Sequence, residues 1–159
     1  MKEIILTKSR VAMVDDDDFD LVSRYKWFCS VQKNTCYAKS RIDGNTIIFM
    51  HRLIMDVTDP KIEVDHKNHD GLCNLKANLR VCTHQQNMHN QKLSKISTSG
   101  FKGVNWDKTR NKWKCKIKFN GIWKNIGRFT NKEDAARAYD LKAKELFGEF
   151  ARTNFKESS

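Results

Sequence analysis

The residue types best suited to chemistry in this sequence lie between Val64 and Asn87. Asp65 and His66 are adjacent, and Asn78 and Asn87 follow within the same short stretch. Carboxylate and amide oxygens suit a hard divalent cation such as Mg²⁺, and an imidazole with a pKa near working pH can accept a proton from water. A lone Asp–His pair is usually a surface feature, whereas the whole spaced set predicts an oxygen ligand beside a general base.

Short elements must bring these side chains together. Residues 79–82 (LRVC) are typical of a short strand, so the Asp–His pair and Asn78 are expected on or beside one β-hairpin. Residues 83–86 (THQQ) fit a capping box, in which Thr and Gln side chains bond free backbone N–H groups. The sequence therefore predicts a hairpin followed by a helix that begins near His84, with Asn87 one turn into it.

This pattern resembles the HNH nuclease family, whose core is a ββα-metal motif. The resemblance implies that Asp65 and Asn87 hold one Mg²⁺ or Mn²⁺ ion per active site, where it binds the scissile phosphate and stabilises the leaving oxygen. It implies that His66 is the general base and that Asn78 orients His66 or braces the hairpin. The resemblance covers roughly residues 50–92.

Three more residues are candidates for auxiliary roles in that site. The family has histidine at the position of Asn87. His84 lies one turn earlier and is an alternative second ligand. His51 and Arg52 belong to a His-Arg-Leu triplet that recurs before the nuclease hairpin in this branch of the family. They are expected to reach a DNA phosphate or to brace the active site, or else to be one packed histidine and one solvent-facing arginine.

The composition indicates a protein without a membrane span. The chain has 159 residues, 39% hydrophobic and 31% charged, which favours two small cores over one large one. It has no apolar run of about 18 residues, and its first ten residues are too weakly apolar for a signal peptide. The five cysteines form no C-x-x-C pair and are expected to be reduced thiols. We expect a location in the cytoplasm of a bacterial or phage-infected cell, and no protein partner is implied.

The segment before the motif is expected to be β-rich. Strands are predicted over residues 4–6, 11–14, 27–31, 36–41 and 46–50, with a short helix over residues 50–55. Four consecutive acids, residues 15–18, can be mistaken for a metal site. They are expected instead to cap a short helix over residues 19–25 and to complement its dipole.

The positive charge is concentrated in the last part of the chain. Residues 1–92 carry 14 Lys and Arg against 12 Asp and Glu, whereas residues 93–159 carry 16 against 7. Residues 91–100 have the polar composition of a linker, with a domain boundary near Ser94. Beyond it, Lys114, Lys116 and Lys118 alternate with apolar residues, which predicts a strand with one cationic face. Such a block favours a polyanionic partner, double-stranded DNA.

A turn and a helix complete this second part. Asn120-Gly121 predicts a hairpin turn to a return strand over residues 122–126. Residues 130–133 (TNKE) fit a second capping box, the apolar residues that follow have helical spacing, and Gly148 is a C-terminal stop. The sequence predicts three strands packed on one helix.

This C-terminal part resembles the Apetala-2 (ethylene-response-factor) DNA-binding domain of plants. The matching segments are residues 100–104 (GFKGV), 126–129 (IGRF), 135–140 (AARAYD) and 154–155 (NF). The plant domain has mostly Arg and Trp at several DNA-facing positions where this chain has Lys and Asn. Lysine is a point charge rather than a bidentate fork, so the plant target sequence is not transferred. The resemblance implies a DNA-facing set of Lys102, Asn105, Lys116, Lys118, Trp123, Asn125 and Arg128.

The expected architecture is α+β with two domains. Residues 1–93 would form a ββα-metal nuclease module with an N-terminal β-rich segment, and residues 94–159 a three-stranded antiparallel sheet packed on one helix. The function expected is site-specific DNA cleavage of the homing type. The alternatives are a sequence-specific DNA-binding regulator with an inactive nuclease domain, and an RNA-binding or structural protein.

Overall fold

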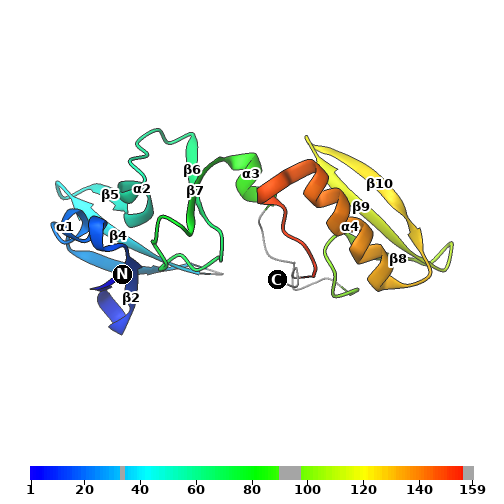
Figure 1. Cartoon of the computed structure of the whole chain (residues 1–159), viewed down its shortest axis with the longest axis horizontal. Coiled ribbons are helices and arrows are strands. Elements are labelled where there is room, and N and C mark those ends of the chain that lie inside the picture. The colour runs from blue at the N-terminus through cyan, green and yellow to red at the C-terminus, as the bar shows by residue number, and fades with distance from the viewer. Residues whose placement is uncertain (33–34, 90–97, 156–159) are drawn as a thin grey trace. The chain divides into compact units, whose positions relative to one another are not determined.

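The computed structural model describes residues 1–32, 35–89 and 98–155. The chain divides into two compact units, Met1–Asn87 (unit 1) and Met88–Ser159 (unit 2). Unit 1 combines small antiparallel sheets with short helices, and unit 2 pairs one antiparallel sheet with a long helix (Figure 1), which is the mixed class expected from the sequence. The predicted domain boundary near Ser94 lies outside the described residues.

Unit 1 is a series of small sheets with short helices between them. The sheets contain β1 (Lys2–Ile5) paired with β2 (Val11–Val14), β3 (Trp27–Val31), β4 (Cys36–Ile42) and β5 (Thr46–Phe49) in that order, and β6 (Ile62–His66) paired with β7 (Leu79–Thr83). The helices are α1 (Phe19–Val22), α2 (Met50–Ile54) and α3 (His84–His89), with short 3₁₀ turns at Thr7–Ser9 and Asp16–Asp18.

One apolar core joins these sheets and supports the later hairpin. Val14 of β2, Trp27 of β3, Met50 of α2 and Leu79 of β7 are buried in the same cluster. Because these residues come from four elements spread over the unit, the β-rich segment and the hairpin share a single interior. We infer that the N-terminal strands are needed to hold the hairpin in place.

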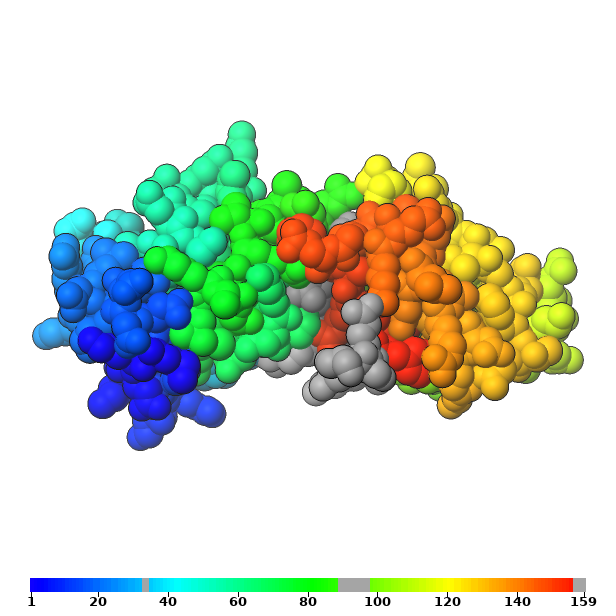
Figure 2. Space-filling model, in the orientation of Figure 1, coloured from blue at the N-terminus to red at the C-terminus, as the bar shows by residue number. Residues whose placement is uncertain are grey.

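The acidic run has a different role from the predicted helix cap. Neither Asp15 nor Asp18 makes a side-chain cap bond at its helix. Instead Asp15 Oδ2 accepts from the backbone N–H of Lys76 at 2.8 Å, and Asp18 Oδ1 contacts Lys76 Nζ at 2.6 Å. The capping prediction was therefore wrong: the acids tie the N-terminal segment to the loop between β6 and β7. Figure 2 shows the blue N-terminal residues in direct contact with green residues of this unit.

Unit 2 is a three-stranded antiparallel sheet covered by one long helix. The strands β8 (Val104–Asp107), β9 (Lys112–Phe119) and β10 (Ile122–Phe129) lie in the order β10-β9-β8, and α4 (Lys132–Phe147) packs along them (Figure 1). A 3₁₀ turn follows at Gly148–Phe150. Small α4 residues, Ala135, Ala136 and Ala143, are completely buried. Their size lets the helix lie close to the buried Cys115 and Ile117 of β9.

The turns of unit 2 agree with the sequence, except at the start of α4. Asn120 and Gly121 connect paired strands with φ values of 49° and 80°, as a type I′ turn requires. Gly148 ends α4 with φ 53°. The helix cap is Asn131, whose side chain accepts from Glu133 N–H, so the predicted capping box at Thr130 was shifted by one residue.

Two expectations from the sequence, on membrane spans and on disulfide bonds, can be compared with the described part of the chain. There, no helix combines the length and the apolar character needed to cross a membrane. The five cysteines are free thiols, and Cys29, Cys82 and Cys115 are buried. They serve as small apolar residues of the cores.

Candidate functional site

The predicted hairpin and helix are present and meet at Thr83. β6 and β7 pair antiparallel, with Asp65 opposite Arg80 and His66 opposite Leu79. α3 begins directly after β7 at His84. Successive strand residues point to opposite faces of a hairpin. Asp65 and His66 therefore flank the end of β6 on its two faces, rather than lying side by side on one face.

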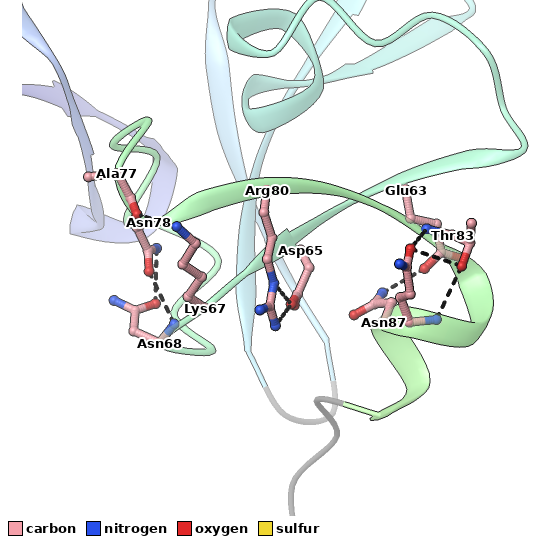
Figure 3. Close-up of polar contacts among 10 residues, drawn as sticks. Glu63, Asp65, Lys67, Asn68, Ala77, Asn78, Arg80, Thr83 and Asn87 are labelled. Atoms are coloured by element: carbon pink, nitrogen blue, oxygen red, sulfur yellow. Dashed lines mark hydrogen bonds and ion pairs between the residues drawn. The ribbon is translucent and has the colours of Figure 1, made fainter. Parts of the chain in front are cut away.

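The start of α3 is fixed by the predicted capping box (Figure 3). Gln86 Oε1 accepts from Thr83 N–H at 2.8 Å, and Thr83 Oγ1 accepts from Gln86 N–H at 3.3 Å. Two backbone donors at the helix start are thus satisfied reciprocally. The cap fixes the direction of α3, and with it the side chain of Asn87.

Replacement of Thr83 by alanine should lower the free energy of unfolding by about 1 kcal/mol, because the cap bond to Gln86 is lost. Chemical denaturation of the full chain followed by circular dichroism measures this change. Thr58→Ala is the matched control, since Thr58 is exposed in a loop of the same unit. Equal stability of the two variants would contradict a stabilising cap.

His66 is buried in a cluster of aromatic rings. Its ring centroid lies 5.9 Å from that of Tyr37 and 5.0 Å from that of His51, and Nε2 lies 3.2 Å from Asn74 Oδ1. Burial lowers the pKa of His66 below its ordinary value, while the Asn74 contact and the charge of Asp65 oppose that change. The ring is therefore neutral at neutral pH, the form that can accept a proton.

His51 and Arg52 have structural surroundings in unit 1. Burial lowers the pKa of His51 to about 3, and its Nδ1 atom is buried without a hydrogen-bond partner. Arg52 donates to the carbonyl oxygens of Ile62 at 2.6 Å and Asp59 at 2.8 Å. Arg52 thereby ties α2 to the loop that enters β6.

Asn78 braces the loop between β6 and β7 (Figure 3). Its Oδ1 atom accepts from Asn68 N–H at 3.1 Å, and its Nδ2 atom donates to Asn68 Oδ1 at 3.0 Å. The Nδ2 atom also donates to Cys73 O at 2.7 Å. The predicted alternatives were orientation of His66 or bracing of the hairpin, and these contacts belong to bracing. Asn74, rather than Asn78, is the residue in contact with His66.

Asp65 and Asn87 are engaged in separate contacts on the hairpin (Figure 3). Asp65 Oδ2 accepts from Arg80 at 2.7 and 2.9 Å, and both side chains are largely buried. Asn87 Nδ2 donates to Glu63 Oε2 at 2.6 Å, and His84 Nδ1 lies 2.7 Å from Glu63 Oε1. Glu63 therefore joins the two α3 residues that were candidate ligands.

The oxygen donors of this face fit a hard divalent cation. Glu63 and Asp65 lie on the same face of β6, two residues apart, and Asn87 uses only its Nδ2 atom in the Glu63 contact. In the described part of the chain, no group of three or more His, Cys, Asp and Glu side chains is arranged to hold a metal. A Mg²⁺ ion needs fewer protein ligands than that, because it keeps several waters.

The DNA-facing set predicted in unit 2 lies on one face of its sheet, apart from Lys102. Strand pairing places Asn105 opposite Lys114, Asn125 opposite Lys116 and Trp123 opposite Lys118. A bulge between Asn125 and Gly127 brings Arg128 opposite Lys114, and so returns it to the same face. Lys102 precedes β8 instead, and burial lowers the pKa of its amine to about 8.

Two contacts order the cationic face of this sheet. Lys116 Nζ lies 4.3 Å from the centre of the Trp123 ring, a cation–π geometry, and the indole remains 57% exposed. Arg128 Nε donates to Asp107 Oδ2 at 2.9 Å, and this bond lowers the pKa of Asp107. The face thus presents held cations and an exposed aromatic ring.

Comparison with known proteins agrees with the geometry of unit 1. A model of the family described as HNH endonuclease matches residues 49–89, which hold α2, the hairpin and α3. An uncharacterized HNH endonuclease of Acanthamoeba polyphaga mimivirus is 37% identical over 150 residues, covering 92% of this chain and 76% of the relative. The chain belongs to the HNH endonuclease family.

The match to the mimivirus HNH endonuclease extends over both units, because it covers nearly the whole chain. A second relative, Protein 3.8 of Escherichia phage T7, is 34% identical over 89 residues, covering 56% of this chain and 73% of the relative. No solved structure matches.

Two site residues of this HNH endonuclease escaped the sequence analysis. Glu63 could have been found from the sequence. Side chains alternate along a strand, so Glu63 lies on the same face of β6 as Asp65. Asn74 had none: it lies in the irregular loop between β6 and β7, and only the fold brings it to His66. Both contact residues that the family resemblance had already assigned.

Proposed function

We propose that this chain is a site-specific DNA endonuclease of the homing type, in which unit 1 hydrolyses a phosphodiester bond with one divalent metal ion. His66 is the general base, and Asp65 and Asn87 are the metal ligands. The observation that carries the proposal is the neutral His66 at the end of β6, beside a strand face that bears two carboxylates. Family membership supports the same reaction class.

The hydrolytic step follows from the state of His66. A ring nitrogen accepts a proton from water as the water oxygen bonds to phosphorus, and the bond from phosphorus to the leaving sugar oxygen breaks. The leaving oxygen takes a proton from solvent. The rings of Tyr37 and His51 pack against the imidazole and hold the base in one orientation.

Asp65 and Asn87 would hold the metal ion, with Glu63 as a third oxygen donor. When bound, a Mg²⁺ or Mn²⁺ ion supplies charge stabilisation at the phosphate. Arg80 contacts Asp65 as an ion pair at 2.7 Å and fixes the position of its carboxylate. Glu63 positions Asn87 and His84 on α3. The Asn87–Glu63 bond supports a metal site formed by the β6 carboxylates and the α3 amide.

Unit 2 is proposed to select the DNA site as an Apetala-2-like domain. Its sheet face carries Lys116, Lys118, Asn125 and Arg128 around the exposed Trp123. A β-sheet can enter the major groove, where lysine and asparagine can contact phosphates and base edges. The support is the excess of positive charge in residues 93–159 together with this one-sided arrangement.

One assay separates this proposal from a DNA-binding regulator with an inactive nuclease. Supercoiled and linear DNA are incubated with the full chain and Mg²⁺ or Mn²⁺, beside EDTA. A metal-dependent nuclease converts supercoiled DNA into nicked or linear DNA only when the metal is present. Binding without cleavage under every metal condition would favour the regulator, and absence of duplex binding would favour an RNA-binding or structural protein.

Replacement of Asp65 or Asn87 by alanine should raise the Mg²⁺ concentration needed for half-maximal cleavage, or abolish cleavage. Few protein ligands hold such an ion, so each one matters. Cleavage measured over a Mg²⁺ titration tests this, with Asp17→Ala as the control, because Asp17 is an exposed acid of the same unit. Unchanged Mg²⁺ dependence in both variants, or tightly bound stoichiometric zinc in the purified chain, would contradict the assignment.

A further inference from the structure

Asn74 is a fully buried polar side chain in contact with His66. Its exposed fraction is 0%, although it belongs to an irregular loop between β6 and β7. Burial of an amide is costly unless its hydrogen bonds are made. The position of those bonds therefore indicates what Asn74 does.

The contacts of Asn74 fix which end of its amide faces His66. Nδ2 donates to the backbone carbonyl of Leu72 at 3.2 Å and contacts Met50 Sδ at 3.4 Å. A carbonyl oxygen can only accept, so the NH₂ group must face Leu72. The other end of the amide, Oδ1, then lies 3.2 Å from His66 Nε2. Rotation of the amide by half a turn would place two oxygens against each other.

This orientation decides the proton position on the His66 ring. Because Oδ1 of Asn74 is an acceptor, Nε2 of His66 must be the N–H donor, and in a neutral ring Nδ1 then carries the lone pair. The lone pair of His66 is therefore on the ring nitrogen that does not face Asn74.

The backbone of Asn74 is held by the N-terminal strands. Asn74 N–H donates to Met13 O at 2.8 Å, and Met13 N–H donates to Leu72 O at 2.8 Å. Leu72 O thus accepts from both Met13 N–H and the Asn74 amide. β2 extends into the loop through these bonds, which fixes the depth at which Asn74 is inserted.

We propose that Asn74 is a positioning residue for DNA cleavage, one that holds His66 as the Nε2–H tautomer and so presents Nδ1 as the atom that accepts the proton from water. This inference rests on the proposed function, because it assigns the orientation of its base. It also gives the paired strands β1 and β2 a role in the reaction, since β2 holds the backbone of Asn74. Asn74 touches neither water nor DNA in this role and acts only through His66.

The direct test is the proton position on His66 in the unmodified full chain. Nitrogen-15 NMR of the histidine rings distinguishes the two neutral tautomers, because the protonated and unprotonated ring nitrogens differ in chemical shift. The expected result is a proton on Nε2 of His66, assigned by its loss in His66→Ala. A proton on Nδ1 overturns the inference, and this measurement depends on no folded Asn74 variant.

One variant then connects the tautomer to the reaction. Asn74→Leu removes the acceptor at nearly constant volume and should lower kcat roughly 10- to 100-fold, the range for residues that orient another group, with KM little changed. The same variant should also lose the preference for a proton on Nε2 in the nitrogen-15 spectrum of His66. Asn45→Leu is the matched control, since it makes the same change at an exposed residue of the turn between β4 and β5 and should keep the parent kcat.

The outcomes distinguish this inference from the proposed function. A folded Asn74→Leu chain that has the parent kcat, or that keeps the proton on Nε2 of His66, overturns the positioning role. A parent chain that cuts no DNA with Mg²⁺ or Mn²⁺ refutes the proposed function and the inference with it. An Nδ1–H ring in a chain that does cut refutes the inference alone.

Discussion

Replacement of His66 by alanine is expected to lower the rate of DNA cleavage roughly 10²–10⁴-fold, the usual contribution of a positioned acid–base group. The reason is that His66 is neutral at working pH and lies at the end of the strand that carries Glu63 and Asp65. Initial rates of nicking of supercoiled DNA, measured at saturating Mg²⁺, give the change. DNA affinity should be kept, because the cationic sheet belongs to unit 2.

His69→Ala is the matched control for this experiment. His69 lies in the loop that follows β6, three positions beyond His66, and it should be replaceable with little effect on the rate. Circular dichroism of both variants separates loss of the base from loss of the fold. Cleavage by His66→Ala at the parent rate would move the active site elsewhere, with His69 and His84 as the next candidates.

The parts of unit 1 that could be read from the sequence are those set by neighbours in the chain. The capping box at Thr83 and Gln86 involves residues three apart, so its bonds were foreseeable from residue types alone. The β6–β7 hairpin followed from a short apolar strand next to the Asp–His pair. Local signals of this kind determine where an element begins, and they did so here.

Contacts between distant segments could not be read in the same way. Asp15 and Lys76 are bonded across most of unit 1, and no local pattern distinguishes this tie from a helix cap. The same holds for Asn74, whose neighbours Met13, Met50 and His66 come from three other elements. Such contacts depend on how the small sheets pack around one core. That packing is seen only in the folded structure, not in the amino-acid sequence.

Unit 2 gives a mixed result for a physical reason. The alternation of Lys114, Lys116 and Lys118 predicted the cationic face, because side chains of a strand alternate strictly. On β10, however, Asn125 and Arg128 are three residues apart and would lie on opposite faces without the bulge between Asn125 and Gly127. Their common face was implied by the family resemblance, and its cause is a backbone irregularity that the pattern does not reveal.

The geometry of the candidate site also separates two kinds of residue that the family pattern groups together. Asn78 holds the loop through Asn68 and Cys73, whereas Asn87 reaches the acidic face through Glu63. Loss of Asn78 should therefore act on the structure of the loop, and loss of Asn87 on the metal. The two asparagines of the motif are therefore expected to have different roles.

Replacement of both Lys116 and Lys118 by alanine in the full chain is expected to reduce DNA affinity by well over tenfold at about 0.1 M salt. Each phosphate contact contributes a slope of about −0.9 in log affinity against log salt, so two lost contacts flatten the slope by up to about two units. Fluorescence anisotropy with a labelled duplex over a salt series measures both quantities. If either lysine reads a base edge, site preference relaxes instead by roughly 1–3 kcal/mol at that position.

The matched control removes the same charge from the other side of the sheet. Lys142 and Lys144 lie on α4, which packs on the face opposite Lys116 and Lys118. If unit 2 binds DNA through its sheet, Lys142→Ala combined with Lys144→Ala changes affinity little, because net charge alone does not place a phosphate against a side chain. An equal loss in both double variants would mean that the charge of unit 2 attracts DNA without using this face. Cleavage by the sheet variant should recover at low salt, because His66 and its surroundings in unit 1 are untouched.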